Sequence, residues 1–250
     1  MKRLYFDLET SYNVVASWRV GYNLNLGPNM IIKERAIICV SYKWSNGRVK
    51  NIQWDNGCDK SLLEEFMSIC NEADEVVAHN GDRFDIKWLR TRCLIHGIPA
   101  FPKYVSIDTL KDARNFFNFN SNKLDYIASV LGLGHKGDPG GFDTWKAICE
   151  NNCPIAMKRM VKYCNKDVTL LQQVHEKLLP YTLHKTHYGV KRIDCPECGS
   201  RNTKRNKKTV SSSKVAKIQM NCRDCAKWWT IPESTFLKEA TLDQLEHSNR

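Results

Sequence analysis

The 250-residue sequence lacks any hydrophobic run as long as a membrane-spanning helix requires. Such a helix needs about 20 consecutive apolar residues, and charged or polar residues interrupt every run of this chain before that length. The N-terminus, MKRLYFDLET, also lacks the apolar core and the small-residue cleavage site of a secretory signal peptide. These absences predict a cytoplasmic protein that is neither secreted nor bound to a membrane.

The cysteines do not have the pattern of a disulfide-bonded secreted protein. Their number, eleven, is odd, so they cannot all pair within one chain. Seven are scattered, mostly in apolar stretches, and we interpret them as small buried hydrophobic residues. The other four form two CxxC pairs that are separated by 23 residues, namely Cys195 with Cys198 and Cys222 with Cys225. Four thiolates at this spacing predict one closed, structural Zn²⁺ site. Two redox dithiols are the alternative, although no thioredoxin-like βαβ pattern surrounds either pair.

Acidic residues are scarce around these cysteine pairs. The formal net charge is +11, and residues 185–228 hold twelve Lys and Arg against three Asp and Glu. We therefore predict a domain over residues 1–184 and a basic zinc ribbon with a C-terminal tail over residues 185–250. A solvated basic loop is the alternative. The residues predicted to contact nucleic-acid phosphates are Lys204, Arg205, Lys207, Lys208, Lys214 and Lys217. Trp228 and Trp229 are candidates either for stacking on bases or for packing within the ribbon.

The order of predicted elements in residues 1–184 indicates an α/β fold. Strands are predicted at 2–8, 36–44 and 48–54, with Ser45-Asn46-Gly47 as a hairpin turn in which Asn and Gly tolerate positive φ. The elements that follow are helix 59–70 with Asp59 or Ser61 as its cap, strand 76–79, helix 84–96, strand 105–108 and helices 124–131 and 155–179. This order is typical of a ribonuclease-H-like mixed five-stranded sheet flanked by helices.

A glycine-rich segment at residues 132–143 is predicted to be a mobile loop. Its first six residues, GLGHKG, match the letters of the dinucleotide-binding pattern GxGxxG. That pattern requires a strand before it and a helix after it. Because a predicted helix precedes this segment, no dinucleotide site is predicted here.

Three separated segments carry candidate metal-binding carboxylates. Asp7 and Glu9 end the first strand and lie two residues apart, so they share one face of it. Asp85 lies in the first turn of a helix, and Asp167 follows Tyr163 by four residues on one face of the last helix. Each feature has a simpler explanation by itself. These are an exposed acidic turn, a helix-dipole partner, and a buried Asp167 compensated by a Lys or Arg from elsewhere.

Together the segments resemble the DEDD superfamily of 3′–5′ exonucleases, in the subgroup with tyrosine in its third motif. The likeness is greatest to the proofreading domain of family B DNA polymerases, and it covers roughly residues 1–180. The matching motifs are Phe6-Asp7-Leu8-Glu9-Thr10, Asn80-Gly81-Asp82-Arg83-Phe84-Asp85 and Tyr163-Cys164-Asn165-Lys166-Asp167. The histidine subgroup would require His at position 162, which is Lys162.

The resemblance implies a site with two Mg²⁺ or Mn²⁺ ions. Asp7 would bridge both ions, Glu9 and Asp167 would complete one site, and Asp85 would support the other. Tyr163 would orient the attacking water. Residues at positions Thr10, Asn80 and Phe84 would contact the substrate strand, and Asp108 would support the site structurally.

The function expected from these features is hydrolysis of single-stranded DNA from its 3′ end, with release of nucleoside 5′-monophosphates. An RNA 3′-exonuclease of the same superfamily is one alternative. A transposase or integrase of the same fold is another, although those enzymes lack the Tyr-x3-Asp helix. A non-catalytic adaptor that binds nucleic acid through the ribbon is a third. The sequence identifies no replication or repair partner.

Overall fold

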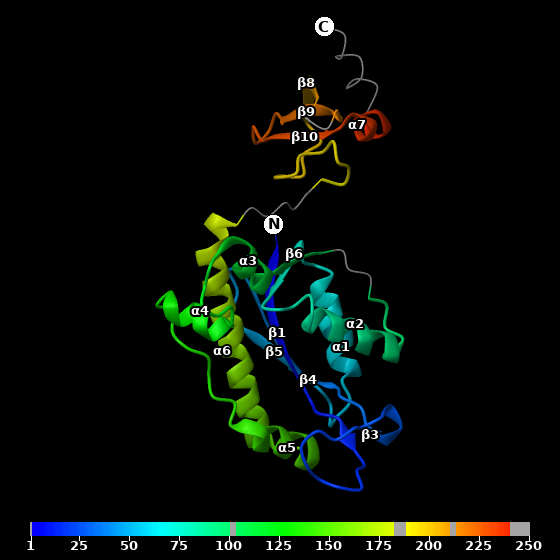
Figure 1. Cartoon of the computed structure of the whole chain (residues 1–250), viewed down its shortest axis with the longest axis vertical. Helices are drawn as coiled ribbons and strands as arrows, with labels where there is room; N and C mark the ends of the chain where they lie inside the picture. The colour runs from blue at the N-terminus through cyan, green and yellow to red at the C-terminus, as the bar shows by residue number, and fades with distance from the viewer. Residues whose placement is uncertain (1, 101–103, 183–188, 211–213, 241–250) are drawn as a thin grey trace. The chain divides into compact units, whose positions relative to one another are not determined.

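The chain divides into two compact units, an N-terminal unit of residues 1–182 and a C-terminal unit of residues 183–250. The computed structural model describes residues 2–100, 104–182, 189–210 and 214–240 (Figure 1). The boundary predicted between residues 184 and 185 and the tail after residue 240 lie outside these ranges. Among the described helices, none combines the length and the apolar character that crossing a membrane requires.

A mixed five-stranded sheet forms the centre of the N-terminal unit. Its strands are β1 (Arg3–Thr10), β4 (Ile37–Trp44), β5 (Lys50–Gln53), β6 (Glu75–Ala78) and β7 (Val105–Asp108). They lie in the order β5-β4-β1-β6-β7. β1 runs antiparallel to β4 and parallel to β6, so the direction of pairing changes at β1. The predicted sheet is confirmed.

Helices cover both faces of this sheet (Figure 1). α1 (Lys60–Cys70) and α2 (Asp85–His96) pack on one face. The other face is covered by α3 (Thr109–Phe116), α4 (Leu124–Val130), α5 (Gly141–Asn151) and α6 (Pro154–Leu178).

The alternation of side chains along β1 assigns them to these two faces. Leu4 and Phe6 pack with α1 and α2, whereas Tyr5 packs with α4 and α6. Asp7 and Glu9 continue the odd-numbered series, and therefore point to the α6 face. The central strand thus carries both carboxylates toward the longest helix.

Several local details of this unit differ from the predictions. Neither α3 nor α5 was predicted. α5 begins inside the predicted loop at 132–143, directly after the turn-forming residues Asp138-Pro139-Gly140. The β4–β5 hairpin forms, but five residues connect the strands, and neither Asn46 nor Gly47 has positive φ. The turn closes instead through a hydrogen bond from Gly47 N–H to the Trp44 carbonyl.

Ser61 lies inside α1, and Asp59 precedes the helix without a side-chain capping hydrogen bond, so neither predicted cap forms. The buried carboxylate of Asp59 accepts two hydrogen bonds from Arg92, at 2.7 and 2.8 Å, and one from Ile37 N–H at 2.9 Å. His96 Nε2 lies 2.7 Å from the same carboxylate. This cluster connects β4 and α2 to the start of α1, and a charged group so placed is stabilised by its partners.

The C-terminal unit is a three-stranded antiparallel sheet followed by a short helix. The order is β10 (Trp228–Pro232), β9 (Ala216–Cys222) and β8 (Thr203–Val210), and α7 spans Glu233–Glu239. Its small core consists of Ile193, Ile218, Met220, Ile231 and Phe236. This core is much smaller than the two largest clusters of the N-terminal unit.

Candidate active site and cysteine cluster

Three carboxylates from β1 and α6 meet on one side of the central sheet. Asp7, Glu9 and Asp167 each offer an oxygen that lies within 4.8 Å of the other two. Asp7 and Glu9 occupy alternate positions of β1, whereas Asp167 lies in the middle of α6 and is buried. Such oxygens at this spacing are suited to share a divalent cation.

Asp85, the fourth predicted acid, reaches the same strand from α2. It is the first residue of that helix and is buried. Its Oδ1 accepts a hydrogen bond from the backbone N–H of Leu8 at 3.3 Å, between the two acids of β1. Asp85 is not one of the three acids within 4.8 Å of one another, but it contacts their strand.

The crowding of these acids is electrostatically unfavourable without a cation. Burial, and then repulsion by Asp167, raises the pKa of Asp7 to about 7. Burial, and then repulsion by Asp7, raises the pKa of Glu9 to about 8. Burial and repulsion by Asp7 also raise the pKa of Asp85. The site therefore favours whatever positive charge can enter it.

Lys136 supplies one positive charge, and it is the site residue that the sequence did not predict. Its Nζ lies 2.7 Å from Asp167 Oδ2 and 5.3 Å from the centre of the Tyr163 ring. Burial acts to lower the pKa of Lys136, but attraction to Asp167 outweighs it and raises that pKa. The simpler explanation for a buried Asp167, charge compensation by a lysine from elsewhere in the chain, therefore holds for its Oδ2 oxygen. Among the described residues, Asp167 Oδ1 has no hydrogen-bond partner.

The glycine-rich segment is what brings Lys136 to the site. The backbone N–H of Lys136 donates to Asp125 Oδ1 at 2.6 Å, and the Lys136 carbonyl accepts a hydrogen bond from Lys166 Nζ at 3.2 Å. A Cβ at Gly137 would lie 3.3 Å from Tyr163 Cδ2, which is closer than ordinary contact. The absence of a side chain at Gly137 therefore lets the loop pack against Tyr163.

Tyr163 lies one helical turn before Asp167 on α6 and is partly buried. Burial, and then repulsion by Asp167, raises the pKa of its phenol above the ordinary value. Because the phenol is protonated at neutral pH, it is suited to donate a hydrogen bond or to orient a water, and not to act as a base.

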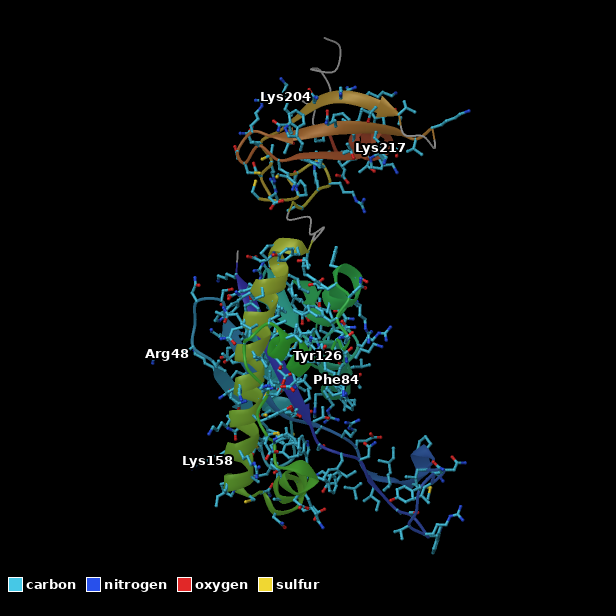
Figure 2. All side chains as sticks on the ribbon, turned by 60° about the vertical axis from the view of Figure 1, so that its left-hand side comes forward. Arg48, Phe84, Tyr126, Lys158, Lys204 and Lys217 are labelled. Carbon is cyan, nitrogen blue, oxygen red and sulfur yellow. The ribbon has the colours of Figure 1, made fainter. Side chains whose placement is uncertain are left out.

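The loop between β6 and α2 holds the predicted strand-contacting residues Asn80 and Phe84. Asn80 has a φ of +65° and donates its N–H to Asp108 Oδ1 at 2.8 Å. A Cβ at Gly81 would lie 2.5 Å from Ala78 Cβ, so glycine is required there. Phe84, labelled in Figure 2, is partly buried and packs edge-on against the Trp88 ring. The loop is thus held rigidly beside the carboxylates, with Asp108 as its support.

A cleft of about 660 Å³ opens next to this loop. Its lining residues come from the β6–α2 loop, α3, the segment before α4 and the glycine-rich loop, and they include His79, Asn80, Arg114, Asn122, Lys123, Asp125 and Lys136. The charged lining is mainly basic, which favours a polyanionic strand. Thr10, by contrast, is buried, and its hydroxyl accepts a hydrogen bond from Arg35 at 3.0 Å. Its contact with a strand stays a prediction.

The four cysteines of the C-terminal unit form a second compact cluster. The sulfur atoms of Cys195, Cys198, Cys222 and Cys225 all lie within 4.8 Å of one another. Cys195 Sγ is 3.5 Å from Cys225 Sγ, and Cys198 Sγ is 3.6 Å from Cys222 Sγ. These distances exceed the S–S bond of about 2.05 Å, so no disulfide joins them.

Most of the N-terminal unit matches a known protein family. Residues 34–179 match the family described as the RNase_H superfamily. The chain belongs to the RNase_H superfamily. The ribonuclease-H-like fold predicted from the element order is therefore confirmed. Among the curated proteins, none matches the sequence significantly.

A solved structure similar to this RNase_H-superfamily protein is that of the family B DNA polymerase from the hyperthermophilic archaeon Pyrobaculum calidifontis. The TM-score is 0.56 at 19% sequence identity, over 72% of this chain and 24% of the polymerase chain. This likeness concerns the fold. The superfamily membership supports nuclease activity on a nucleic-acid substrate, and nucleases of this superfamily use divalent metal ions.

The basic residues of the C-terminal unit lie outside the family match, and they do not form one uniform surface. Arg205 stacks over the Phe236 ring at 5.5 Å, and Lys208 pairs with Glu233 at 2.8 Å, so both are engaged within the unit. Lys204, Lys207 and Lys214 are exposed. Lys217, labelled with Lys204 in Figure 2, is partly buried.

Strand register separates the two neighbouring tryptophans of β10. Lys204 lies opposite Asn221, and Asn221 lies opposite Trp228, so these three form one row across the sheet. Trp228 is 51% exposed. Trp229 points to the other face, packs on the small core and donates its Nε1–H to the Arg192 carbonyl at 3.3 Å. Of the two candidates, Trp228 is thus the one free to stack on a base.

Proposed function

We propose that this protein is a metal-dependent 3′–5′ exonuclease that hydrolyses single-stranded DNA to nucleoside 5′-monophosphates. The observation that carries this proposal is the meeting of Asp7, Glu9 and Asp167 within 4.8 Å, with Asp85 bonded to the same strand. Tyr163, one turn before Asp167 on α6, adds a water-orienting phenol. The superfamily membership supports the nuclease activity, and the motif order supports the 3′–5′ polarity.

The residues fit hard divalent cations. All four candidate ligands are carboxylates, which suit Mg²⁺ or Mn²⁺. Asp167 Oδ1 is buried without a hydrogen-bond partner among the described residues. Asp7, Glu9 and Asp167 would hold one ion, and Asp7 with Asp85 would hold the second. When bound, such ions activate a water and stabilise the leaving 3′ oxygen.

The side chains around the carboxylates have separate tasks in this proposal. Tyr163 donates a hydrogen bond that orients the attacking water. Asn80 and Phe84 hold the terminal nucleotides, with the base against the Phe84 ring. Lys136, whose ammonium lies 2.7 Å from Asp167 Oδ2, would neutralise the charge of a phosphate held at the carboxylates.

The cysteine cluster fits one structural Zn²⁺. Tetrahedral zinc with Zn–S bonds of about 2.3 Å places sulfurs about 3.8 Å apart, close to the 3.5 and 3.6 Å found here. Burial acts to raise the pKa of Cys222, but hydrogen bonds from the backbone N–H groups of Cys225 and Asp224 lower it to about 7. Cys222 thus readily forms the thiolate that zinc binding requires, whereas the pKa values of Cys195 and Cys198 are raised in the cluster without a metal.

The zinc ribbon grips the flanking nucleic acid in this proposal. Support comes from the exposed Lys204, Lys207 and Lys214 and from Trp228, which combine phosphate contacts with a stacking surface. Arg205 and Lys208 contribute less, because each already has a partner within the unit.

Digestion of end-labelled strands tests the proposed function. The full chain is incubated with 5′-labelled and 3′-labelled single-stranded DNA and RNA, in Mg²⁺, Mn²⁺ or EDTA. We expect 5′-labelled DNA to shorten one nucleotide at a time and 3′-labelled DNA to release mononucleotide at once. EDTA and the Asp7→Asn variant should both abolish release.

Internal cleavage, or release from the 5′ end, would contradict the proposed polarity. Faster digestion of RNA than of DNA would identify RNA as the preferred substrate. Tight binding without hydrolysis under every metal condition would favour the adaptor instead.

A further inference from the structure

A long segment between β1 and β4 takes no part in the site described so far. Residues 12–33, which we name the aromatic arm, leave the central sheet and return to it. Two short strands, β2 (Val14–Val15) and β3 (Ile31–Lys33), pair at its base, and the tip at residues 17–27 is irregular. Figure 1 shows the arm, in dark blue, extending beyond the ends of β1 and β4. Figure 2 shows its side chains standing apart from the other side chains of the N-terminal unit.

The tip of the arm exposes large apolar side chains. Trp18 is 102% exposed, Val20 97% and Tyr22 100%, so their side chains contact almost nothing in the described structure. Single exposed hydrophobic residues are common, but a tryptophan, a valine and a tyrosine on one short tip are a cluster that marks an interaction site.

The charge of the arm indicates which kind of partner this tip fits. No Asp or Glu occurs between Thr10 and Lys33. Arg19 lies between the two aromatic residues and is exposed. Aromatic rings that alternate with a cation and lack acidic neighbours are suited to a nucleic-acid strand, because every base offers a π-face and every phosphate a negative charge.

The base of the arm is fixed to the end of the strand that carries Asp7 and Glu9. Arg35 donates to the Ser11 carbonyl at 3.0 Å and stacks over Trp88 of α2. On the other side, Tyr12 donates its hydroxyl to Glu150 Oε1 at 2.8 Å. The arm therefore starts from a rigid base, although its tip has few contacts.

The length of the arm sets how far from the carboxylates it can act. Trp18 follows Thr10 by eight residues, so an extended chain places it at most about 26–29 Å from the end of β1. That upper limit allows the tip to reach a strand several nucleotides away from the terminal phosphodiester, and the arm extends away from the strand ends that carry the carboxylates (Figure 1).

We propose that the aromatic arm is a stacking platform for bases of the substrate strand several nucleotides away from the 3′ end. Trp18 and Tyr22 stack on bases, and Arg19 pairs with a phosphate. This proposal rests on the proposed function, because it takes the strand held at the carboxylates as its ligand. It predicts that long strands are bound more tightly than short ones through the arm.

The test measures binding in the full-length, zinc-loaded chain carrying Asp7→Asn, so that no hydrolysis occurs. Affinity for a fluorescent 20-nucleotide single strand and for a 4-nucleotide strand is measured by anisotropy, with and without Trp18→Ala and Tyr22→Ala. We expect affinity for the long strand to fall about fivefold or more for each ring removed. Affinity for the short strand should be unchanged.

Matched variants separate stacking from simple loss of apolar surface. Trp18→Phe with Tyr22→Phe should keep most of the affinity, since both rings remain. Leu94→Ala, at another exposed apolar side chain on α2, should change nothing. Arg19→Ala should reduce the dependence of affinity on salt, whereas removal of the rings should shift affinity equally at every salt concentration.

Equal affinity of the alanine variants and the parent for the long strand would overturn the proposal. So would unchanged DNA affinity together with a loss of self-association in sedimentation, because the arm would then be a protein-docking surface. A failure of the proposed function would be recognised separately, as an absence of nucleotide release by the chain with Asp7 intact.

Discussion

The acidic cluster and the cysteine cluster both hold candidate metal ligands close together, but different forces position these ligands. Each gathers like-charged ligands from separate stretches of the chain. The acids lie on the central strand and on the longest helix of a unit with three large hydrophobic clusters, so their positions are fixed by packing. The cysteines lie at the end of β9 and in the connecting segments of a unit with five core side chains. We infer that the first unit folds without its metal, at an electrostatic cost, and that the second requires its metal to fold.

Removal of the proposed zinc ion should have the largest effect. Structural zinc contributes about 10–16 kcal/mol to the folding of small zinc domains, more than the small core of the C-terminal unit can replace. A strong zinc chelator, or Cys222→Ser, should therefore unfold residues 189–240 and leave the N-terminal unit folded. Amide NMR spectra of the full chain would show this as selective loss of dispersed signals. Retention of a folded C-terminal unit without zinc would contradict the inference that this unit requires its metal to fold.

Asp7→Asn should separate stability from activity in the N-terminal unit. The loss of nucleotide release should exceed the roughly 10–100-fold that removal of an outer-shell partner costs. The pKa values of Asp7 and Glu9 are raised to about 7 and about 8. A raised folded-state pKa means that these acids destabilise the metal-free fold progressively as pH rises above their ordinary value of about 4.

The variant should therefore unfold at a higher temperature than the parent in EDTA at pH 8. At pH 4 the difference should vanish, because the parent acids are then protonated. A parent protein more stable than the variant in EDTA at pH 8 would show that a residual cation, and not burial, sets the charge of this site.

Asp59→Asn tests a charge cluster that stabilises the fold instead of opposing it. Burial acts to raise the pKa of Asp59, but hydrogen bonds from Arg92, Ile37 N–H and His96 outweigh it and lower that pKa. A lowered pKa means that the stabilisation is present above the ordinary value of about 4 and is lost as pH falls below it. We expect a loss of about 3–5 kcal/mol at pH 7 in urea unfolding.

The difference between parent and Asp59→Asn should shrink toward pH 3. The exposed Asp55→Asn serves as the matched control and should change stability little. Equal losses at pH 7 and pH 3 would assign the effect to packing and not to charge.

Single substitutions on the ribbon surface should have the smallest effects. Lys204→Ala should reduce the slope of log affinity against log salt for single-stranded DNA by about 0.7. Lys208→Ala should change it less, because Lys208 pairs with Glu233. Equal slopes for both variants and the parent would show that this face of the ribbon does not contact nucleic-acid phosphates.

The parts that sequence predicted are those governed by local periodicity. Strand alternation puts Asp7 and Glu9 on one face, and the helical repeat puts Tyr163 and Asp167 on one face. Lys136 was missed because an irregular glycine-rich loop carries it, and no periodicity relates such a loop to a distant helix. Asp59 was misread because its sequence position suits a helix cap, whereas its partner Arg92 is 33 residues away. Tertiary contacts of this kind leave no local pattern.

The central claim is that the buried acids hold divalent cations, and calorimetric titration with Mn²⁺ measures this directly. The chain is first saturated with zinc, so that the cysteines do not contribute. We predict that the parent binds two Mn²⁺ ions per chain, that Asp7→Asn loses at least one of them, and that Asp55→Asn binds as the parent does. Identical stoichiometry and affinity in Asp7→Asn and the parent would contradict the account.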